Sequence, residues 1–308
     1  MDAELTGKTF VLTGATSGIG LAAARLLAER GAFLIGVGRS AERCAQAESL
    51  LRSAYPHAHV QYCVADLSEQ AQNRRLVAGI RADLTEHRLN SLDGLINCAG
   101  TFTFRKTITP EGFEMQWAVN HLAPFLLTHE LLPLLQAAPA GRVVTVSSGS
   151  HYHTRLRWND IQLERGYFCL LAYQQTKLCN VLFTAELNRQ LGNKSTLRAF
   201  AADPGLVNTE MGFKGNPALV RWIWSIRRRS GVPAEQSGRG VVYLATEPSI
   251  QNSPEIYWRD GHPKAPNPYA LDEKAAQRLW TLSEQMCGIK PGQYFGAKEP
   301  EMNGDKRL

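Results

Sequence analysis

The sequence predicts an α/β fold in which a doubly wound, mostly parallel, seven-stranded sheet carries helices on both faces. Short continuous apolar runs alternate with amphipathic stretches through residues 9–201. This alternation is typical of parallel strands buried on both faces and joined by helical crossovers. The strands are expected at Thr9–Thr13, Phe33–Val37, Val60–Val64, Gly94–Asn97, Val143–Ser147, Leu197–Ala201 and Glu255–Trp258.

The helices follow from amphipathic spacing between these runs. They are expected at Ile19–Arg30, Ala41–Ala54, Ser68–His87, Pro110–Gln136, Leu170–Leu191, Ala218–Arg228, Ala234–Thr246 and Asp272–Cys287. No internal repeat or low-complexity linker interrupts the pattern, so we expect a single domain over residues 1–308. Within it, residues 205–232 form a substrate-side loop and helix, and residues 259–308 form a C-terminal extension.

Composition narrows the class of protein. The chain has 308 residues, 44% hydrophobic and 20% charged, which is enough for a large core and argues against disorder. The six cysteines include no CxxC pair and are expected to be free thiols in a reducing compartment, and no metal site is expected. No signal peptide or long apolar span is present, so we expect a soluble, cytoplasmic protein.

The net charge of +6 is concentrated in residues 142–229. Only Arg227, Arg228 and Arg229 form a run there, and a nucleic-acid surface needs clustered cations with groove-reading or aromatic elements. A nucleic-acid partner is therefore not expected.

A glycine-rich turn follows the first expected strand and opens the first expected helix. Glycines allow a tight turn and close approach to a pyrophosphate, and the helix N-terminus presents unpaired N–H groups. The context predicts a Rossmann-type dinucleotide site. Its residues are Gly14, Thr16, Ser17, Gly18, Ile19 and Gly20.

Arg39 stands at the end of the second expected strand, where an NAD site carries an acidic residue for the ribose 2′-hydroxyl. A guanidinium can instead pair with a 2′-phosphate and stack on adenine. Arg39 therefore predicts NADP(H) as the cofactor.

Tyr173 and Lys177 are four residues apart on an expected helix, so they project from one face. A tyrosine with a pKa near 10 is a poor acid or base at neutral pH, and a neighbouring cation lowers that pKa. Ser147 and Ser148 lie upstream at the end of an expected strand. Together these residues predict a proton-transfer site.

The GxxxGxG turn, the run Asn97-Cys98-Ala99-Gly100 and the Tyr173–Lys177 pair resemble the short-chain dehydrogenase/reductase family in its single-domain form. The resemblance spans about Leu5 to Cys287, and Cys98 departs from the asparagine usual there. It implies four catalytic residues and a longer set of cofactor contacts. The catalytic residues are Asn120, Ser148, Tyr173 and Lys177, and the further cofactor contacts are Asp66, Leu67, Asn97, Ala99, Gly100, Tyr173, Lys177, Pro204, Gly205, Val207 and Thr209.

The resemblance also implies a role for each catalytic residue. Ser148 binds the substrate oxygen, Tyr173 exchanges its proton, Lys177 lowers the pKa of the tyrosine, and Asn120 kinks its helix and holds a relay water. The spacing between Ser148 and Tyr173 is longer than in many members, which predicts an extended loop over residues 151–167.

Residues 111–116, 119–122 and the tail pattern from Gly261 to Trp280 look closest to the retinol dehydrogenase-like branch. This implies an NADP(H)-dependent oxidoreductase that interconverts a hydrophobic alcohol and its ketone or aldehyde. The alternatives are a non-catalytic NADP(H)-sensing protein, or an epimerase or dehydratase on the same fold. Three interpretations of the helix at Ala218–Arg228 are considered: it packs on the domain, it forms a lid, or it makes a peripheral membrane contact. Whether the protein forms a homodimer is not decided by the sequence.

Overall fold

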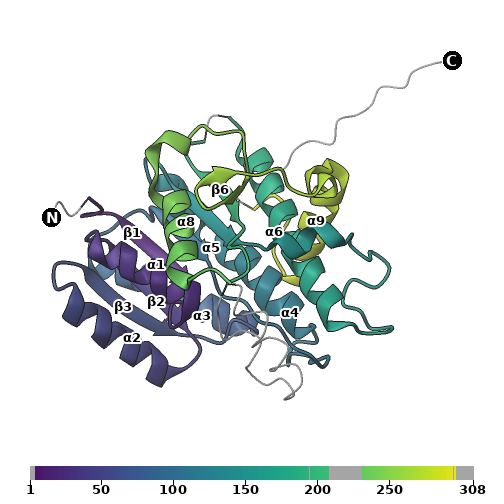
Figure 1. Cartoon of the computed structure of the whole chain (residues 1–308), viewed down its shortest axis with the longest axis horizontal. Coiled ribbons are helices and arrows are strands. Elements are labelled where there is room, and N and C mark those ends of the chain that lie inside the picture. Colours follow the sequence, from purple (N-terminus) through teal and green to yellow (C-terminus); the bar gives the residue numbers. More distant parts are fainter. Residues whose placement is uncertain (1–3, 194, 208–230, 294, 296–308) are drawn as a thin grey trace.

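The computed structural model describes residues 4–193, 195–207, 231–293 and 295. Its strands are β1 (Thr9–Thr13), β2 (Phe33–Gly38), β3 (His59–Val64), β4 (Gly94–Asn97), β5 (Arg142–Val146), β6 (Arg198–Ala202), β7 (Tyr257–Arg259) and β8 (His262–Pro263). They form one sheet in the order β3-β2-β1-β4-β5-β6-β7-β8 (Figure 1). Neighbours from β3 to β7 pair in parallel, while β7 and β8 pair antiparallel.

The expected parallel sheet is confirmed, with its strand ends shifted by at most two residues. The short strand β8 was not expected. It consists of two exposed residues, of which Pro263 faces Trp258 and His262 faces Arg259. Such a strand is not marked by an apolar run, because its residues are exposed and it forms through a tight hairpin.

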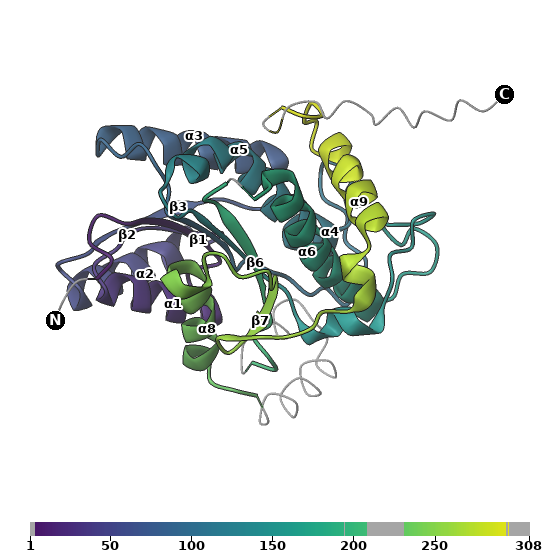
Figure 2. The same cartoon turned by 90° about the horizontal axis from the view of Figure 1, so that it is seen from above.

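Helices cover the sheet on both sides. They are α1 (Gly18–Glu29), α2 (Ala41–Ala54), α3 (Gln70–Glu86), α4 (Met115–Trp117), α5 (Ala123–Ala137), α6 (Cys169–Leu191), α8 (Ala234–Thr246) and α9 (Glu273–Met286), with a π-helical segment η1 (Ala118–Leu122) and 3₁₀ turns η2 (Gly149–His153), η3 (Pro248–Ile250) and η4 (Pro268–Leu271). Figure 2 shows α1, α2 and α8 on one face and α3, α5 and α6 on the other. The helix expected at Ala218–Arg228 lies outside the described residues.

The expected helix Pro110–Gln136 is wrong at its start. Residues Thr109–Phe113 form a turn closed by a 2.8 Å bond from the Thr109 N–H to the Phe113 carbonyl, and Gly112 has a φ of +86°. Glu114 then caps α4, its carboxylate accepting a 2.8 Å bond from the Trp117 N–H. The turn and the cap delay the helix, and η1 interrupts it before α5 begins.

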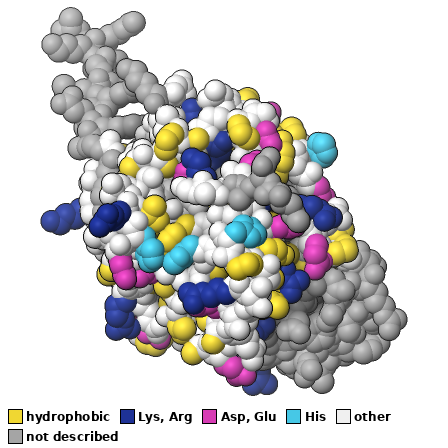
Figure 3. All heavy atoms as spheres, turned by 90° about the vertical axis from the view of Figure 1, so that its left-hand side faces the viewer, with side chains coloured by type: hydrophobic (Ala, Val, Ile, Leu, Met, Phe, Trp, Pro, Cys, Tyr) yellow, Lys and Arg dark blue, Asp and Glu magenta, His cyan; other side chains and the backbone are white. Residues whose placement is uncertain are grey.

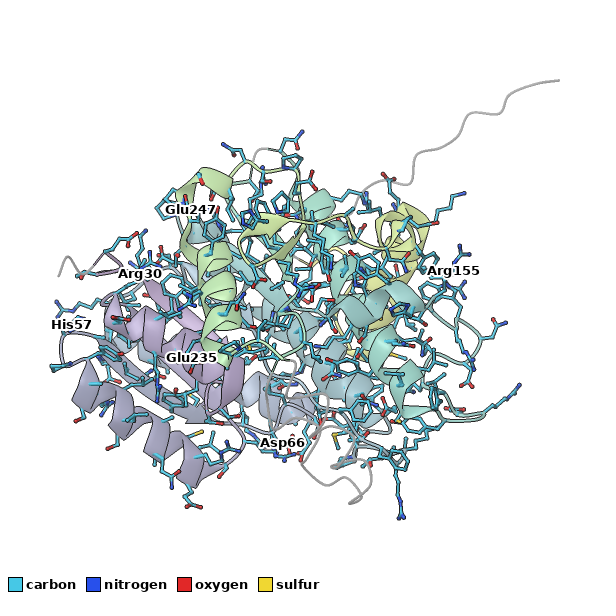
Figure 4. The ribbon with its side chains drawn as sticks, viewed as in Figure 1. Arg30, His57, Asp66, Arg155, Glu235 and Glu247 are labelled. Carbon is cyan, nitrogen blue, oxygen red and sulfur yellow. The ribbon has the colours of Figure 1, made fainter. Side chains whose placement is uncertain are left out.

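Each face of the sheet has its own apolar core. On the α1 side, Gly238 of α8 lets the helices approach closely, since a Cβ there would lie 2.9 Å from the Ala22 Cβ. Arg30 links the same pair through a 3.0 Å bond to the Thr246 hydroxyl, and Figure 4 shows Arg30 beside α8. On the other side, Trp280 of α9 packs edge-on against Phe125, with ring centres 5.0 Å apart. The described part of the C-terminal extension therefore contributes to the core through α9.

Candidate active site

The loops that follow the parallel strands carry most of the expected site residues along one edge of the sheet. The strand order reverses at β1, which has β2 on one side and β4 on the other. Open α/β sheets bind ligands in the crevice beyond the strand ends at such a point. Asp66, which follows β3, lies on the lower side of the molecule in Figure 4.

The glycine turn between β1 and α1 is tightly packed backbone. Gly14 has a φ of +70°, and a Cβ there would lie 2.8 Å from the Ala99 Cα. A Cβ on Gly20 would lie 2.2 Å from the Gly14 carbonyl oxygen. Ser17 precedes α1 and makes no side-chain capping bond, and the first turn holds no acidic residue. These features fit a pyrophosphate, which the helix N-terminus and the close backbone can receive.

Arg39 is exposed and directly follows β2. A Cβ on Gly38 would lie 2.5 Å from the Thr16 Cγ2, so the end of β2 touches the glycine turn. Among the described residues, Arg39 forms no ion pair. Its guanidinium is therefore available to an anion that binds beside the turn.

Asp66 and Leu67 form a turn before α3. The Asp66 carboxylate accepts a 3.0 Å bond from the Ser68 N–H, and the Leu67 carbonyl accepts a 3.2 Å bond from the Asn73 amide. Glu69, not Asp66, occupies the N-cap position of α3. Asp66 is partly exposed, so its carboxylate retains acceptor capacity at the edge of the crevice.

Asn97, Ala99 and Gly100 lie in the loop after β4, directly beside β1. The Thr13 hydroxyl accepts 3.1 Å bonds from the N–H groups of Cys98 and Ala99, which fixes this loop against the glycine turn. The Asn97 amide donates to Thr128, while its buried Oδ1 has no hydrogen-bond partner. Cys98 preserves this backbone path, and burial raises the pKa of its thiol to about 12, so it is no reactive thiolate.

Asn120 lies in the π-helical segment η1 and is fully buried. Its Oδ1 accepts a 2.7 Å bond from the Thr101 N–H, and its Nδ2 donates to the Thr101 carbonyl at 3.0 Å. The same Nδ2 lies 3.2 Å from the Thr176 hydroxyl of α6. Asn120 thus ties the loop after β4 to the helix that carries Tyr173 and Lys177. A π-helical turn at this residue agrees with the expected local distortion of the helix.

Ser148, Tyr173 and Lys177 converge beyond the end of β5. Ser148 caps η2, which packs against α6, and its side chain lowers the pKa of Tyr173. The buried Lys177 ammonium lies 5.5 Å from the centre of the Tyr173 ring and donates a 2.9 Å bond to the Val146 carbonyl. Ser147, by contrast, donates to the Lys177 carbonyl at 2.7 Å and supports α6.

Burial dominates the ionisation of this group. It raises the pKa of Tyr173 to about 12, against the lowering effect of the Ser148 side chain. It lowers the pKa of Lys177 to about 8. The lowering of the tyrosine pKa expected from Lys177 stays a prediction, and in this structure the Lys177 ammonium donates to the Val146 carbonyl. Tyr173 is therefore protonated at neutral pH.

The loop after β6 holds Pro204, Gly205 and Val207. Gly205 has a φ of +74°, and the Pro204 carbonyl accepts a 2.8 Å bond from Ser237 of α8. Val207 pairs with Val232 in an isolated parallel bridge. This loop lies beside the end of β5, whereas Thr209 falls outside the described residues.

Four functional candidates were missed by the sequence reasoning: His151, Asp203, Lys264 and Asn267. Asp203 is buried and forms a 3.0 Å ion pair with Lys264, and His151 receives a 3.0 Å hydrogen bond from the Asn267 backbone. The position of Asp203 at a strand end, next to the strand that leads to Ser148, could have marked it. No pattern marks Lys264 or Asn267, because they reach the site from the distant C-terminal extension.

Apolar side chains lie on the loops that carry the site residues. Phe102 contacts the Tyr173 ring edge-on, with ring centres 5.7 Å apart. Large hydrophobic residues on the neighbouring loops and at the start of α6 are exposed, namely Phe104, Ile108, Phe168, Leu170 and Leu206. In the part of the chain that the structure describes, no helix is long and apolar enough to cross a membrane.

A dinucleotide-binding α/β sheet with a serine, a tyrosine and a lysine at its crevice defines an oxidoreductase of the nucleotide-binding type. Residues 8–218 match the family model for short chain dehydrogenase. The chain is 35% identical over 293 residues to retinol dehydrogenase 14 of Mus musculus, which covers 92% of this chain and 86% of that protein. It is also 35% identical over 298 residues to retinol dehydrogenase 13 of Homo sapiens, covering 94% and 87%.

Among solved structures, an uncharacterized protein from Mycobacterium paratuberculosis aligns over 94% of this chain and 98% of its own, with a TM-score of 0.72 and 32% identity. The chain belongs to the short-chain dehydrogenase family, in its retinol dehydrogenase-like branch. The resemblance inferred from the motifs is thereby confirmed.

Proposed function

We propose that this protein is an NADP(H)-dependent oxidoreductase that reduces hydrophobic aldehydes or ketones and oxidises the corresponding alcohols. The observation that carries the proposal is the convergence of Ser148, Tyr173 and Lys177 at the end of β5, with Asn120 bonded to the same helix. When bound, the nicotinamide supplies or accepts the hydride.

Tyr173 is the proton donor in the reductive direction. Its pKa of about 12 keeps the hydroxyl protonated at neutral pH, ready to protonate the carbonyl oxygen as the carbonyl carbon accepts a hydride. The Ser148 hydroxyl polarises the same oxygen. Lys177 keeps a cation near the ring and stabilises the phenolate formed after proton transfer. Asn120, through a water shared with Lys177, returns a proton to the site.

Two groups of residues would hold the cofactor. The backbone of Gly14–Gly20 would hold the pyrophosphate, with Arg39 on the adenosine 2′-phosphate and Asp66 and Leu67 on the adenine. At the nicotinamide end, Asn97, Ala99 and Gly100 would line one side, and Pro204, Gly205, Val207 and Thr209 the other. The tight contact of Gly14 with Ala99 supports this assignment, because it leaves backbone and not side chains facing the crevice.

The substrate class follows from the mouth of the site. Phe102 covers the edge of Tyr173, and exposed aromatic and aliphatic side chains such as Phe104 and Phe168 continue outward. Such a rim favours a lipophilic substrate, because burial of apolar surface supplies its binding energy. Retinal is one candidate, since retinol dehydrogenases are close relatives.

A substrate panel assayed with NADPH and with NADH tests the proposal. It contains all-trans-retinal, medium-chain aldehydes and hydrophobic ketones, and the expected result is NADPH oxidation with the lipophilic members. Tyr173→Phe should lower kcat by about 10²- to 10⁴-fold, since it removes the proton donor. Its NADPH affinity, measured by fluorescence titration, should stay unchanged.

Full turnover by Tyr173→Phe would reject the assignment. Tight NADPH binding without turnover on any member of the panel would favour the sensor alternative instead. A cytoplasmic location, a peripheral membrane contact and a homodimer are further proposals.

A further inference from the structure

The backbone of Ser148 is held by a buried histidine. The His151 Nδ1 lies 2.8 Å from the Ser148 carbonyl oxygen, and the His151 N–H donates to the same oxygen at 3.1 Å. His151 is fully buried, and burial lowers the pKa of its imidazole. The ring is therefore neutral at physiological pH and carries a proton on one nitrogen.

The second ring nitrogen determines where that proton sits. The Asn267 N–H donates a 3.0 Å bond to His151 Nε2, so Nε2 must be the acceptor. The proton is consequently on Nδ1, which donates to the Ser148 carbonyl. The Asn267 side chain adds a 3.1 Å bond from its Nδ2 to the His151 carbonyl, so it holds both ends of the histidine.

The same C-terminal segment also restrains Gly149, the residue after Ser148, through Asp203. The Asp203 Oδ1 accepts bonds from the Gly149 N–H at 3.2 Å and from the Gly205 N–H at 3.0 Å. Its Oδ2 is paired with Lys264, three residues before Asn267. The C-terminal extension thus holds the loop after β5 at two neighbouring points.

We propose that His151 and Asn267 are positioning residues that hold Ser148 in place beside Tyr173, where its hydroxyl can polarise the substrate oxygen. This inference rests on the catalytic role of Ser148 in the proposed function. The serine backbone is extended, with a φ of −170°, and its hydroxyl also contacts Ser150. The bond from His151 Nδ1 restrains the Ser148 carbonyl, and with it the backbone from which the serine hydroxyl projects. Neither His151 nor Asn267 needs to touch the substrate.

Two isosteric variants of His151 separate positioning from stability. His151→Asn keeps an amide N–H at the place of Nδ1 and loses the acceptor for Asn267. His151→Gln keeps an acceptor at the place of Nε2 and loses the donor to Ser148. Each variant loses one buried hydrogen bond. If His151 has only a structural role, the two variants should show the same drop in Tm and the same drop in kcat.

The positioning role predicts an unequal loss. His151→Gln should lower kcat by about 10- to 100-fold, as expected for a displaced reacting group, while His151→Asn restores most of the activity. KM for NADPH should stay unchanged in both, since the glycine turn is remote from His151. Both should show a similar drop in Tm.

The pH profile of alcohol oxidation gives a second readout. Ser148 lowers the pKa of Tyr173, so a displaced serine should move the half-maximal rate to higher pH in His151→Gln and not in His151→Asn. The charged groups that face Tyr173, Lys177 and Asp203, are the same in both variants.

Two variants of Asn267 give an independent test. Its φ of −53° suits proline, so Asn267→Pro removes the N–H that bonds to His151 without forcing the backbone, whereas Asn267→Ala keeps it. Asn267→Pro should therefore lose more kcat than Asn267→Ala.

Equal losses of kcat in His151→Asn and His151→Gln, in step with Tm and without a shift in pH profile, would overturn the positioning role. Ser148→Ala serves as the reference. If that variant keeps full activity, the proposed function itself fails and the inference falls with it. If Ser148→Ala is inactive while His151→Gln keeps wild-type kcat, only the positioning role is rejected.

Discussion

Arg39 lies beside the glycine turn without an acidic partner among the described residues. Arg39→Ser should raise KM for NADPH by about 10- to 100-fold, since a hydrogen bond to a charged group contributes about 1.5–3 kcal/mol. KM for NADH should change little, because NADH lacks the 2′-phosphate. Steady-state kinetics with both cofactors measure the ratio.

Arg25→Ser is the matched control for this change. Arg25 is also exposed, but it lies within α1 and away from the end of β2, so its loss removes one positive charge and no phosphate contact. Equal changes in KM for both cofactors, or the same effect from Arg25→Ser, would remove Arg39 from the cofactor site.

The sequence predicts those site residues whose role depends on neighbours close by in the chain. Tyr173 and Lys177 share one helical turn, and Arg39 follows its strand directly, so spacing alone indicates them. His151 is different. Its function depends on which nitrogen carries the proton, and Asn267, more than a hundred residues away, decides that. Spacing cannot reveal a tautomer.

The junction of β1 and α1 is the element whose geometry depends most on glycine. Gly20→Ala would place a Cβ 2.2 Å from the Gly14 carbonyl oxygen, and both partners are backbone. The turn must open, so we expect a loss of about 1–3 kcal/mol of unfolding free energy and weaker NADPH binding. Urea unfolding and NADPH titration measure the two effects.

Gly79→Ala is the control, because Gly79 lies exposed in α3 with nothing within 4 Å of a built Cβ. There the alanine should stabilise the protein by about 1 kcal/mol through helix propensity, without effect on NADPH affinity. A neutral Gly20→Ala variant would show that the turn tolerates a side chain and would weaken its assignment as a phosphate cradle.

The elements themselves were predictable where burial or amphipathic spacing defines them. Strands β1 and β4 and helices α2 and α8 match their expected bounds residue for residue. The start of the helix expected at Pro110 was not predictable in this way, since Gly112 in a left-handed conformation and the capping carboxylate of Glu114 end the turn locally. Apolar periodicity does not detect either feature.

At the scale of the whole molecule, charge is distributed without a dominant sign on the face shown in Figure 3. Basic, acidic, histidine and apolar side chains are intermixed there over the described residues. The expectation of no nucleic-acid partner stays a prediction, and the run at Arg227–Arg229 lies outside the described residues.

The contacts of the C-terminal extension could not be predicted from the sequence pattern. Its helix α9 packs on α6 (Figure 1). Lys264 pairs with Asp203, which binds the loop after β5, and Asn267 binds His151 in that loop. The extension thus contributes to the core on one side and to the candidate site on the other. Both contacts are long-range, so amphipathic spacing predicts the helix but not its partner.

Two buried histidines make the unfolding free energy depend on pH. Burial lowers the pKa of His121 to about 3 and that of His129 to about 4, from an ordinary value of 6.5. The unfolded chain binds a proton at each of these residues below pH 6.5, and the folded protein does not. Unfolding free energy therefore falls as the pH decreases, by about 1.4 kcal/mol per pH unit for each such histidine.

His121→Gln isolates one of these contributions. His121 Nε2 lies 2.8 Å from the Ser283 hydroxyl, which donates to the Leu279 carbonyl, so the histidine must donate, and a glutamine amide can replace that donor without titrating. Between about pH 6 and pH 4 the variant should lose less unfolding free energy than the wild type, by about 1.4 kcal/mol per pH unit. Between pH 7.5 and 8.5, where a neutral histidine is present in both states, the difference between the two proteins should be constant. Parallel unfolding curves over the whole range would mean that His121 titrates in the folded core as it does in the unfolded chain. A protonated His121 buried against α9 would then need a charged partner, and its contact there is the Ser283 hydroxyl.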